Sequence, residues 1–369
     1  MLIDVYCYDD IDNPRCGGGG AMREIKVHQL ISARHYVRFF TGNFPGAKNS
    51  GEPHFALRHL GLPASYLLSR ISFSLIATLK SLFSDADIIA IPYSIYSPVL
   101  TFLLKPKKTV VLFFHITGNE VFKKYNVLGI FPWIAEKAAL AFGKNYITLT
   151  DSMASHLLSK RKNIRAKAGY VSFESSLFSA SAAFDEFVLC FGRIDVHMKG
   201  LDILIPAFEK IASRFPKYKL IIAGRGQETN VNWVLKRIKD SPYRDRIQCL
   251  VNINDDKRKE LLQSAAFVCM PSRFEGWNIA AVEAAACSRA TLGTRIQGLT
   301  DAIKENVTGL LVAPEDVDAL AEKMALLLAD PGLRERLGKN GYKWAQNFTW
   351  EEVAKIQEDF YREVFQSNK

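Results

Sequence analysis

Short apolar runs alternate with longer segments of helical periodicity along the whole chain. Apolar runs of this length, separated by helical segments, are typical of buried parallel strands joined by crossover helices. The chain has 369 residues, enough for two domains that each bury a core. We therefore predict an α/β fold, with strands over 2–8, 37–41, 88–91, 109–114, 146–150, 187–192, 218–223, 246–251, 266–271 and 290–293.

The stretch 168–186 is rich in Ser and Ala and has neither strand nor helix periodicity, which indicates a linker. We therefore expect two Rossmann-like domains, over 1–180 and 181–350, and a C-terminal helix over 351–369 that packs back on the N-terminal domain. Open parallel sheets bind ligands beyond the carboxyl ends of their strands. We expect a ligand cleft between the domains and site residues in the loops that leave the strands.

The charge is uneven. The chain carries 48 Lys and Arg against 38 Asp and Glu, and residues 1–180 hold 21 of the basic and 12 of the acidic side chains. A basic half favours an anionic partner, such as a membrane surface or a phosphorylated ligand. Nucleic acid is not expected, because the longest basic run is 160–162 and no nucleic-acid-binding motif accompanies it.

Cellular location is predicted from cysteines and apolar runs. The six cysteines form no Cys-x-x-Cys pair, which favours buried free thiols in a reducing compartment. Asp4 interrupts the apolar start that a secretory segment needs, and the apolar region 85–104 is broken by Asp and Pro. We predict a cytoplasmic protein, with association at the inner face of the membrane as a further expectation.

Two segments of the first half bear on membrane contact. The segment 65–83 has leucines and isoleucines at spacings of three, four and seven, which predicts a helix that faces the core, with a membrane-lying helix as the alternative. The segment 121–133 mixes Lys123 and Lys124 with aromatic residues, as either a membrane-touching loop or a cleft-lining loop would.

One strand-to-helix loop of the second half carries two cations. Arg193 follows Gly192 at the end of a predicted strand, and Lys199 precedes Gly200 at the start of the next helix. The free amides of a helix N-terminus favour an anion, and a guanidinium with an ammonium suits a diphosphate. Without a ligand, the same two residues would be ordinary surface cations.

The segment 271–283, PSRFEGWNIAAVE, places two carboxylates near one helix start. Glu275 lies in the loop after a buried strand, and Glu283 lies about two turns into the helix, with its side chain tilted toward the N-terminus. The amides of residues 276–279 are free there, so the carboxylates can accept hydrogen bonds from the hydroxyls of a ribose and a sugar. In the alternative, Glu275 caps the helix and Glu283 pairs with Arg289 or Arg295.

These residues together resemble glycosyltransferase family 4, the retaining, nucleotide-sugar-dependent group 1 enzymes of the GT-B fold. The resemblance rests on Gly192-Arg193 with Lys199-Gly200, on Ala223-Gly224-Arg225-Gly226, and on two glutamates separated by seven residues in FEGWNIAAVEAA. It is dense over 187–350 and thinner over 1–180. It implies two Rossmann-like domains with a ligand cleft between them.

The resemblance also implies roles for single residues. Arg193 and Lys199 would hold the donor diphosphate, Glu275 would touch the transferred sugar, and Glu283 would bind the ribose. The remaining donor-binding residues implied are Gly192, Gly224, Val251, Asn252, Ile253, Gly276, Trp277, Asn278 and Ile279. The family commonly has Gly-Phe-Gly where this chain has Gly276-Trp277-Asn278, so the Asn278 side chain is expected to narrow the sugar pocket.

The first half matches the family more loosely. Gly18 and Gly19 belong to a run of four glycines after the first strand, where the family has a Gly-rich turn that faces the diphosphate and acceptor. His115 ends the strand 109–114, where the family places a His near the transferred sugar. A flexible turn and a structural histidine are the alternatives.

The predicted activity is retaining transfer of a hexose from a nucleotide-diphosphate sugar, UDP-sugar rather than GDP-mannose, to a hydroxyl of a glycan or lipid-linked acceptor. No cofactor or metal is expected, because Asp85-Ala86-Asp87 and Asp316-Val317-Asp318 lie at helix ends. The alternatives are a nucleotide-sugar epimerase and a non-catalytic nucleotide-sugar binding protein. A dehydrogenase is disfavoured because residues 224–229 lack the third glycine of the dinucleotide motif.

Overall fold

The computed structural model describes residues 1–13, 18–94, 96–114, 130–179 and 184–369, which divide into two compact units. Unit 1 comprises Met1–Val171 and Trp350–Lys369, and unit 2 comprises Ser172–Thr349. The division lies at 171–172 and not at residue 180, because the segment after it packs on unit 2. The amide of Ser179 donates to the carbonyl of Ala286 (3.0 Å), and the Cys287 thiol donates to the carbonyl of Leu177 (3.1 Å).

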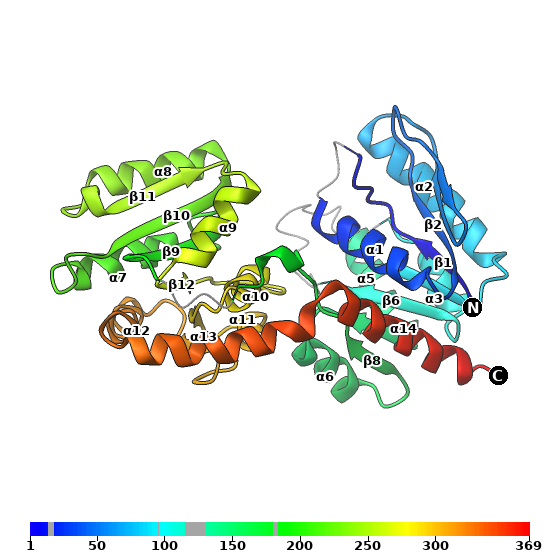
Figure 1. Cartoon of the computed structure of the whole chain (residues 1–369). Coiled ribbons are helices and arrows are strands. Elements are labelled where there is room, and N and C mark those ends of the chain that lie inside the picture. The colour runs from blue at the N-terminus through cyan, green and yellow to red at the C-terminus, as the bar shows by residue number, and fades with distance from the viewer. Residues whose placement is uncertain (14–17, 95, 115–129, 180–183) are drawn as a thin grey trace. The chain divides into compact units, whose positions relative to one another are not determined.

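The described strands of unit 1 form an eight-stranded sheet in the order β3-β4-β2-β1-β5-β6-β7-β8 (Figure 1). All neighbours are parallel except β3 and β4. The short strands β3, β4 and β8 were missed because their sequences are not apolar throughout. The bounds are β1 (Leu2–Tyr6), β2 (Tyr36–Gly42), β3 (Ser50–Glu52), β4 (Phe55–Leu60), β5 (Ile88–Pro92), β6 (Thr109–Phe113), β7 (Asn145–Thr148) and β8 (Arg165–Ala168).

Helices cover both faces of this sheet. One core lies under α1 and α14, and the other lies under α2, α3, α5 and α6. The C-terminal α14 belongs to unit 1, where its Tyr361 hydroxyl lies 3.1 Å from His28 Nε2 of α1. The helices of unit 1 are α1 (Gly18–Ile31), α2 (Tyr66–Leu82), α3 (Val99–Leu104), α5 (Ile130–Phe142), α6 (Asp151–Lys160) and α14 (Trp350–Gln366).

Helix α2 forms where the periodicity predicted it, but the predicted orientation is wrong. Its leucines face outward: Leu75 is 64% exposed and Leu79 is 59% exposed. The face turned to the core carries Phe73 with the small residues Ser69, Ala77 and Ser81. Small side chains let the helix lie close to the sheet, and its larger apolar side chains remain on the outside.

The described strands of unit 2 form an all-parallel, six-stranded sheet in the order β11-β10-β9-β12-β13-β14 (Figure 1). The strands are β9 (Phe187–Ile194), β10 (Lys219–Gly226), β11 (Ile247–Val251), β12 (Phe267–Met270), β13 (Thr291–Thr294) and β14 (Gly309–Val312). The helices are α7 (Leu201–Ala212), α8 (Glu228–Lys239), α9 (Asp255–Ser264), α10 (Ile279–Ala286), α11 (Leu299–Ala302), α12 (Val317–Ala329) and α13 (Pro331–Ala345).

Strands β9 and β10 end side by side, with Gly192 opposite Gly224 and Arg193 opposite Arg225. Gly192 and Gly224 have φ values of 146° and 155°, a conformation that L-residues with side chains rarely adopt. A Cβ on Gly224 would also collide with the carbonyl of Gly192. These glycines bring two strand ends together. Arg193 is the last but one residue of β9, whereas the sequence predicted it in the loop that follows.

Two further expectations concern thiols and membrane spans. Among the described cysteines, Cys190, Cys249, Cys269 and Cys287 are free thiols, and burial raises the pKa of the Cys190 thiol to about 12. Within the described ranges, every helix is too short or too polar to cross a bilayer.

Candidate functional site

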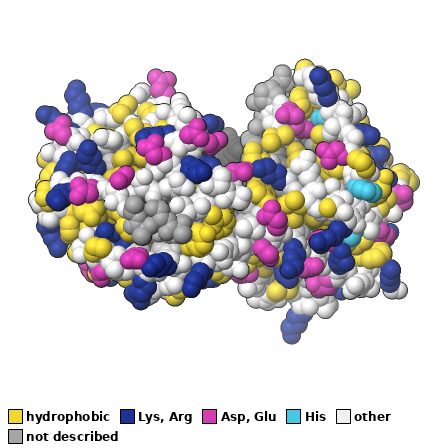
Figure 2. Space-filling model, viewed as in Figure 1, with side chains coloured by type: hydrophobic (Ala, Val, Ile, Leu, Met, Phe, Trp, Pro, Cys, Tyr) yellow, Lys and Arg dark blue, Asp and Glu magenta, His cyan; other side chains and the backbone are white. Residues whose placement is uncertain are grey.

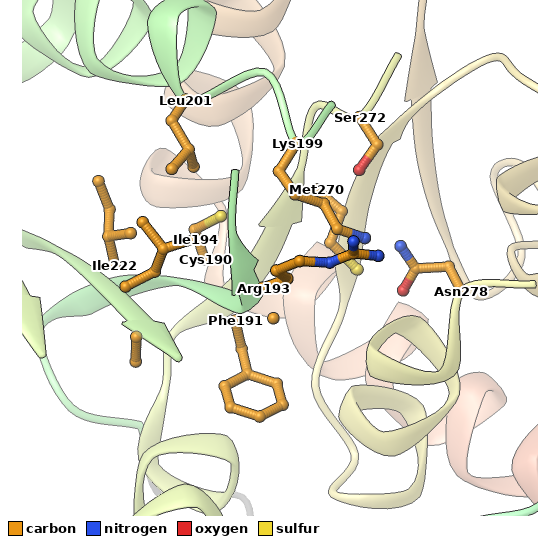
Figure 3. Close-up of a pocket in the computed structure, with 12 residues that line it drawn as sticks. Cys190, Phe191, Arg193, Ile194, Lys199, Leu201, Ile222, Met270, Ser272 and Asn278 are labelled. Atoms are coloured by element: carbon orange, nitrogen blue, oxygen red, sulfur yellow. The ribbon is translucent and has the colours of Figure 1, made fainter. Parts of the chain in front are cut away.

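Arg193 extends from the end of β9 toward the start of α10. Its side chain is exposed and forms no hydrogen bond or ion pair with any residue in the described part of the chain. In Figure 3 its guanidinium points toward the Lys199 ammonium and the Asn278 amide, and all three residues line one pocket. Arg193 is therefore a cation with unused hydrogen-bond donors at the carboxyl end of the sheet.

Lys199 is placed by the loop between β9 and α7. Its amide donates to the carbonyl of Asp195 (3.0 Å), and Gly200 then adopts a left-handed conformation with φ 64°. A Cβ on Gly200 would collide with the carbonyl of Pro271, so this loop passes directly against the loop after β12. The close approach brings Lys199 Nζ within 2.5 Å of Glu275 Oε1.

Three donors converge on Glu275 Oε1: Lys199 Nζ at 2.5 Å, Ser272 Oγ at 2.7 Å and Asn278 Nδ2 at 2.9 Å. This shell neutralises the carboxylate and fixes its orientation. The role of Ser272 was not predicted from the sequence, although this residue lies within the segment 271–283. Its position three residues before Glu275 could have indicated that its hydroxyl reaches the Glu275 carboxylate.

Asn278 caps α10, with Oδ1 accepting from the Ala281 amide at 2.8 Å. The alternative in which Glu275 caps this helix is therefore wrong. The Asn278 side chain is used at both ends, since its amide nitrogen donates to Glu275. Its departure from the family's glycine thus adds a donor to the Glu275 carboxylate.

Glu283 lies on α10 and is buried, and its Oε1 accepts from Arg258 Nη1 of α9 (3.2 Å). Burial raises the pKa of this carboxyl from 4.5 to about 7, and Arg258 opposes the shift. The alternative pairing with Arg289 or Arg295 is wrong: Arg289 Nε donates to the carbonyl of Cys287 (2.8 Å), and Arg295 binds Glu305. Sequence reasoning missed Arg258 because nothing local links it to Glu283.

A hollow of about 500 Å³ opens beside these residues. It brings together four predicted donor-binding residues, Gly192, Arg193, Gly224 and Ile253, with four that were not predicted. The lining residues are Phe191, Gly192, Arg193, Gly224, Arg225, Ile253, Asp255 and Arg258.

Backbone geometry fixes the rim of this hollow. The amide of Asn252 donates to the carbonyl of Gly224 (2.8 Å), and Asn252 has a φ of 56°. Val251 is paired with Gly224 in the sheet. The turn 251–253 is therefore held against the end of β10, with Ile253 reaching the hollow.

Some predicted residues take other positions. The Trp277 ring is buried and packs edge-on against Phe348, with centroids 5.1 Å apart, so this side chain belongs to the core of unit 2. Gly276 precedes that helix and Ile279 begins it. Gly18 and Gly19 form the start of α1 in unit 1. His115 and the loop 121–129 lie outside the described residues.

The two Asp-x-Asp sequences have structural partners. Asp85 Oδ1 accepts from Arg38 (2.6 Å) and Asp87 Oδ2 accepts from the amide of Leu2 (2.9 Å). Asp316 caps α12 by accepting from the Ala319 amide (2.8 Å). No group of three or more His, Cys, Asp or Glu side chains arranged for a metal ion occurs in the part of the chain that the structure covers.

The second half matches a known family. Residues 177–344 match the family model for glycosyl transferases group 1. The chain is 32% identical over 198 residues to a D-inositol 3-phosphate glycosyltransferase of Kribbella flavida, covering 48% of this chain and 44% of that protein. It is 27% identical to the capsular polysaccharide biosynthesis glycosyltransferase CapM of Staphylococcus aureus, covering 65% and 67%. The chain thus spans less than half the length of several curated relatives that it matches.

Solved structures resemble the whole chain. Sucrose-phosphate synthase from Thermosynechococcus elongatus superposes with a TM-score of 0.78 at 21% identity, covering 100% of both chains. Anabaena HepE, solved in complex with UDP, gives a TM-score of 0.75 at 17% identity, also with 100% of both chains covered. At these identities the likeness defines the fold. The chain therefore has the GT-B fold, and its residues 177–344 are similar to the group 1 glycosyltransferases.

Proposed function

We propose that this protein transfers a hexose from UDP-hexose to a hydroxyl of a glycan or lipid-linked acceptor, with retention of configuration at the anomeric carbon. The observation that carries the proposal is the exposed Arg193 guanidinium beside the Lys199–Glu275 pair, at the edge of a hollow bounded by Gly192 and Gly224. The binding of UDP by HepE, a protein of the same fold, supports the choice of nucleotide.

The hollow offers a complementary surface to a nucleoside diphosphate. Arg193 would bind the diphosphate, and Glu283 would accept hydrogen bonds from the ribose hydroxyls, with Arg258 holding its carboxylate in place. The uncharged Ile253 and the backbone of the turn 251–253 would receive the base. The three arginines that line the hollow and the bare glycine backbone match a flat, anionic ligand.

The proposed reaction needs only charge stabilisation by the protein. The bond between the anomeric carbon and the diphosphate oxygen breaks, and a bond to the acceptor oxygen forms on the same face. The acceptor proton passes to the departing phosphate oxygen. Arg193 and Lys199 stabilise the negative charge that develops on the diphosphate, and Glu275, held by Ser272 and Asn278, orients the sugar hydroxyls.

The acceptor is assigned by chemical class. The N-terminal residues 1–180 carry the excess of positive charge, which suits a phosphate-bearing lipid carrier or an anionic membrane. The similarity to CapM, a capsular polysaccharide biosynthesis enzyme, supports a role in polysaccharide or glycolipid synthesis at the cytoplasmic face of the membrane.

A thermal-shift screen of nucleotide sugars tests the donor. We expect UDP and UDP-hexoses to raise the melting temperature, by mass action on the folded state, and GDP-mannose to raise it less. A radiolabelled donor of the best-binding class, incubated with a membrane lipid extract, should then yield a labelled product with retained configuration. Donor binding with no transfer to any acceptor would contradict the proposed reaction and favour a binding protein, and isomerised nucleotide sugar would favour an epimerase.

Independence from metal ions is a second expectation of this proposal. The diphosphate charge is met by side-chain cations, so excess chelator should leave the transfer rate within about twofold of the untreated rate. The same assay after readdition of Mg²⁺ or Mn²⁺ is the control. A rate that falls by tenfold or more in chelator and returns with the metal would contradict the assignment of charge stabilisation to Arg193 and Lys199.

A further inference from the structure

The outer face of α2 carries a continuous apolar surface that the proposed donor site does not use. We define the α2–α3 face by the exposed residues Leu67, Leu68, Ile71, Leu75, Ile76, Leu79 and Phe83 of α2 and its end, with Leu100, Leu103 and Leu104 of α3. Phe83 is 86% exposed and Leu104 is 66% exposed. A contiguous exposed apolar surface marks a site of contact with a membrane or partner.

The polarity of α2 is inverted relative to a helix of a soluble domain. Its inner side is partly polar: Ser69 Oγ donates to the carbonyl of Asn43 (2.6 Å), and Ser81 Oγ lies 2.5 Å from Thr101 Oγ1 of α3. The second contact joins the two helices, which pack side by side. The hydroxyls on the inner side of α2 thus have hydrogen-bond partners in unit 1. The leucines therefore form the outer face of this helix and do not belong to the core.

The charges around the α2–α3 face are mostly cationic, with Asp85 as an exposed acidic residue just beyond the end of α2. No Asp or Glu occurs from Tyr66 to Phe83, and Lys80, Lys105, Lys107 and Lys108 lie on or beside the two helices. Lys105 Nζ donates to the carbonyl of Ser84 (2.8 Å) and Lys108 Nζ to that of Ala86 (3.2 Å), which places both ammonium groups near the end of α2. Figure 2 shows basic, acidic and hydrophobic side chains together on the viewed surface of the molecule.

A hollow of about 530 Å³ lies at the C-terminal end of α2, and both apolar and charged side chains line it. Ile76, Leu79 and Phe83 line one part of it, and Lys80 lines another, together with Arg38 and the two carboxylates, Asp4 and Asp85, to which Arg38 is ion-paired. Lys80 thus lies beside the apolar side chains, as a cation must to meet phosphate groups while leucines enter an acyl layer.

We propose that the α2–α3 face docks the protein on an anionic lipid bilayer. Charge favours this occupant over a second copy of the chain. A twofold interface sets the same patch against itself, which would bring Lys80 and its neighbours against their own copies. An anionic leaflet instead attracts each nearby cation. The inference deepens the proposed function and rests on it, since a lipid-linked acceptor would be met at this surface.

Vesicle flotation of the full chain tests the docking. We expect binding to vesicles of phosphatidylcholine with about one third phosphatidylglycerol, and much weaker binding to phosphatidylcholine alone. The double variant Leu75→Ser/Leu79→Ser should lower the partition coefficient by at least about tenfold. The matched control is Leu235→Ser/Leu326→Ser, which removes two exposed leucines of unit 2 and should bind as the wild type does.

A second readout does not depend on loss of binding. Tryptophan placed by Leu75→Trp should be quenched by brominated acyl chains in anionic vesicles, and tryptophan placed by Leu235→Trp should not. Unchanged partition of the double variant, or equal quenching at the two positions, would overturn the proposal. A wild-type chain that is dimeric, ignores vesicles and becomes monomeric in the double variant would assign the face to a second copy.

Calorimetric UDP binding, measured on the same samples without vesicles, separates this inference from the proposed function. The double variant should bind UDP as tightly as the wild type. A chain that binds UDP and ignores vesicles overturns only the docking face, and a chain that binds vesicles and ignores UDP overturns only the donor site.

Discussion

Arg193→Ala should lower turnover by about 100- to 1000-fold, or roughly 3 to 4 kcal/mol of transition-state stabilisation. The guanidinium is placed to meet charge that appears on the leaving diphosphate, so its loss acts on kcat rather than on donor affinity alone. The measurement is steady-state transfer from the donor that the thermal-shift screen identifies, with kcat and KM determined separately.

The same substitution should leave the fold intact, and this makes the test sharp. Arg193 is exposed and has no partner within the described residues, so its removal breaks no contact that the structure shows. We expect an unfolding free energy within about 0.5 kcal/mol of the wild type. Arg336→Ala, which removes an exposed arginine of α13, is the matched control. Normal turnover in the Arg193 variant would contradict its role.

Lys199→Ala is expected to affect two functions of the site at once. Lys199 holds Glu275 at 2.5 Å, so its removal leaves that carboxylate with only two neutral donors, Ser272 and Asn278. The variant loses a cation and also loosens the sugar-binding carboxylate. A larger change in KM alongside the loss of kcat is therefore expected for Lys199 than for Arg193.

The sequence predicted the parts of this site that are local. Gly192, Arg193, Lys199 and Glu275 were found because each lies within a few residues of a strand end, where parallel sheets place their ligands. The periodicity of apolar runs likewise located most strands. A local sequence pattern is enough to locate a strand and the site residues that follow its end.

Long-range contacts were not predictable in the same way. Arg258 lies 25 residues from Glu283, and no spacing rule joins α9 to α10. Helix α2 was placed correctly and oriented wrongly, because apolar periodicity says that one face is apolar without saying what covers it. The buried side of α2 instead carries Ser69 and Ser81, whose hydrogen-bond partners Asn43 and Thr101 lie elsewhere in unit 1.

Glu283→Gln should weaken UDP binding and, above pH 7, stabilise the fold. The wild-type carboxyl is buried and its pKa is raised from 4.5 to about 7. A charged acceptor for ribose hydroxyls is worth about 1.5 to 3 kcal/mol, so a roughly 10- to 100-fold loss of UDP affinity is expected at pH 8. Calorimetry with UDP measures it.

The same substitution is expected to raise the free energy of unfolding while it lowers the affinity for UDP. A raised pKa in the folded state means that the folded protein binds the proton more tightly than the unfolded chain does. This contribution is complete below pH 4.5 and is lost as the pH rises through about 7. The difference between those two values corresponds to about 3 kcal/mol, which the glutamine variant should not lose. Urea unfolding at pH 5 and pH 8 should show similar stabilities at the lower pH and a more stable variant at the higher pH.

Glu358→Gln supplies the matched control with the reverse sign. Burial alone would raise the pKa of Glu358, but its ion pairs with Arg362 and His35 outweigh burial and lower the pKa. This carboxylate therefore stabilises the fold above its unfolded pKa, and its glutamine variant should be less stable at pH 8. If Glu283→Gln were also less stable at pH 8, the ion pair between Glu283 and Arg258 would stabilise the fold. A variant that is more stable and binds UDP poorly would instead identify a carboxylate kept buried for its ligand, at a cost to stability.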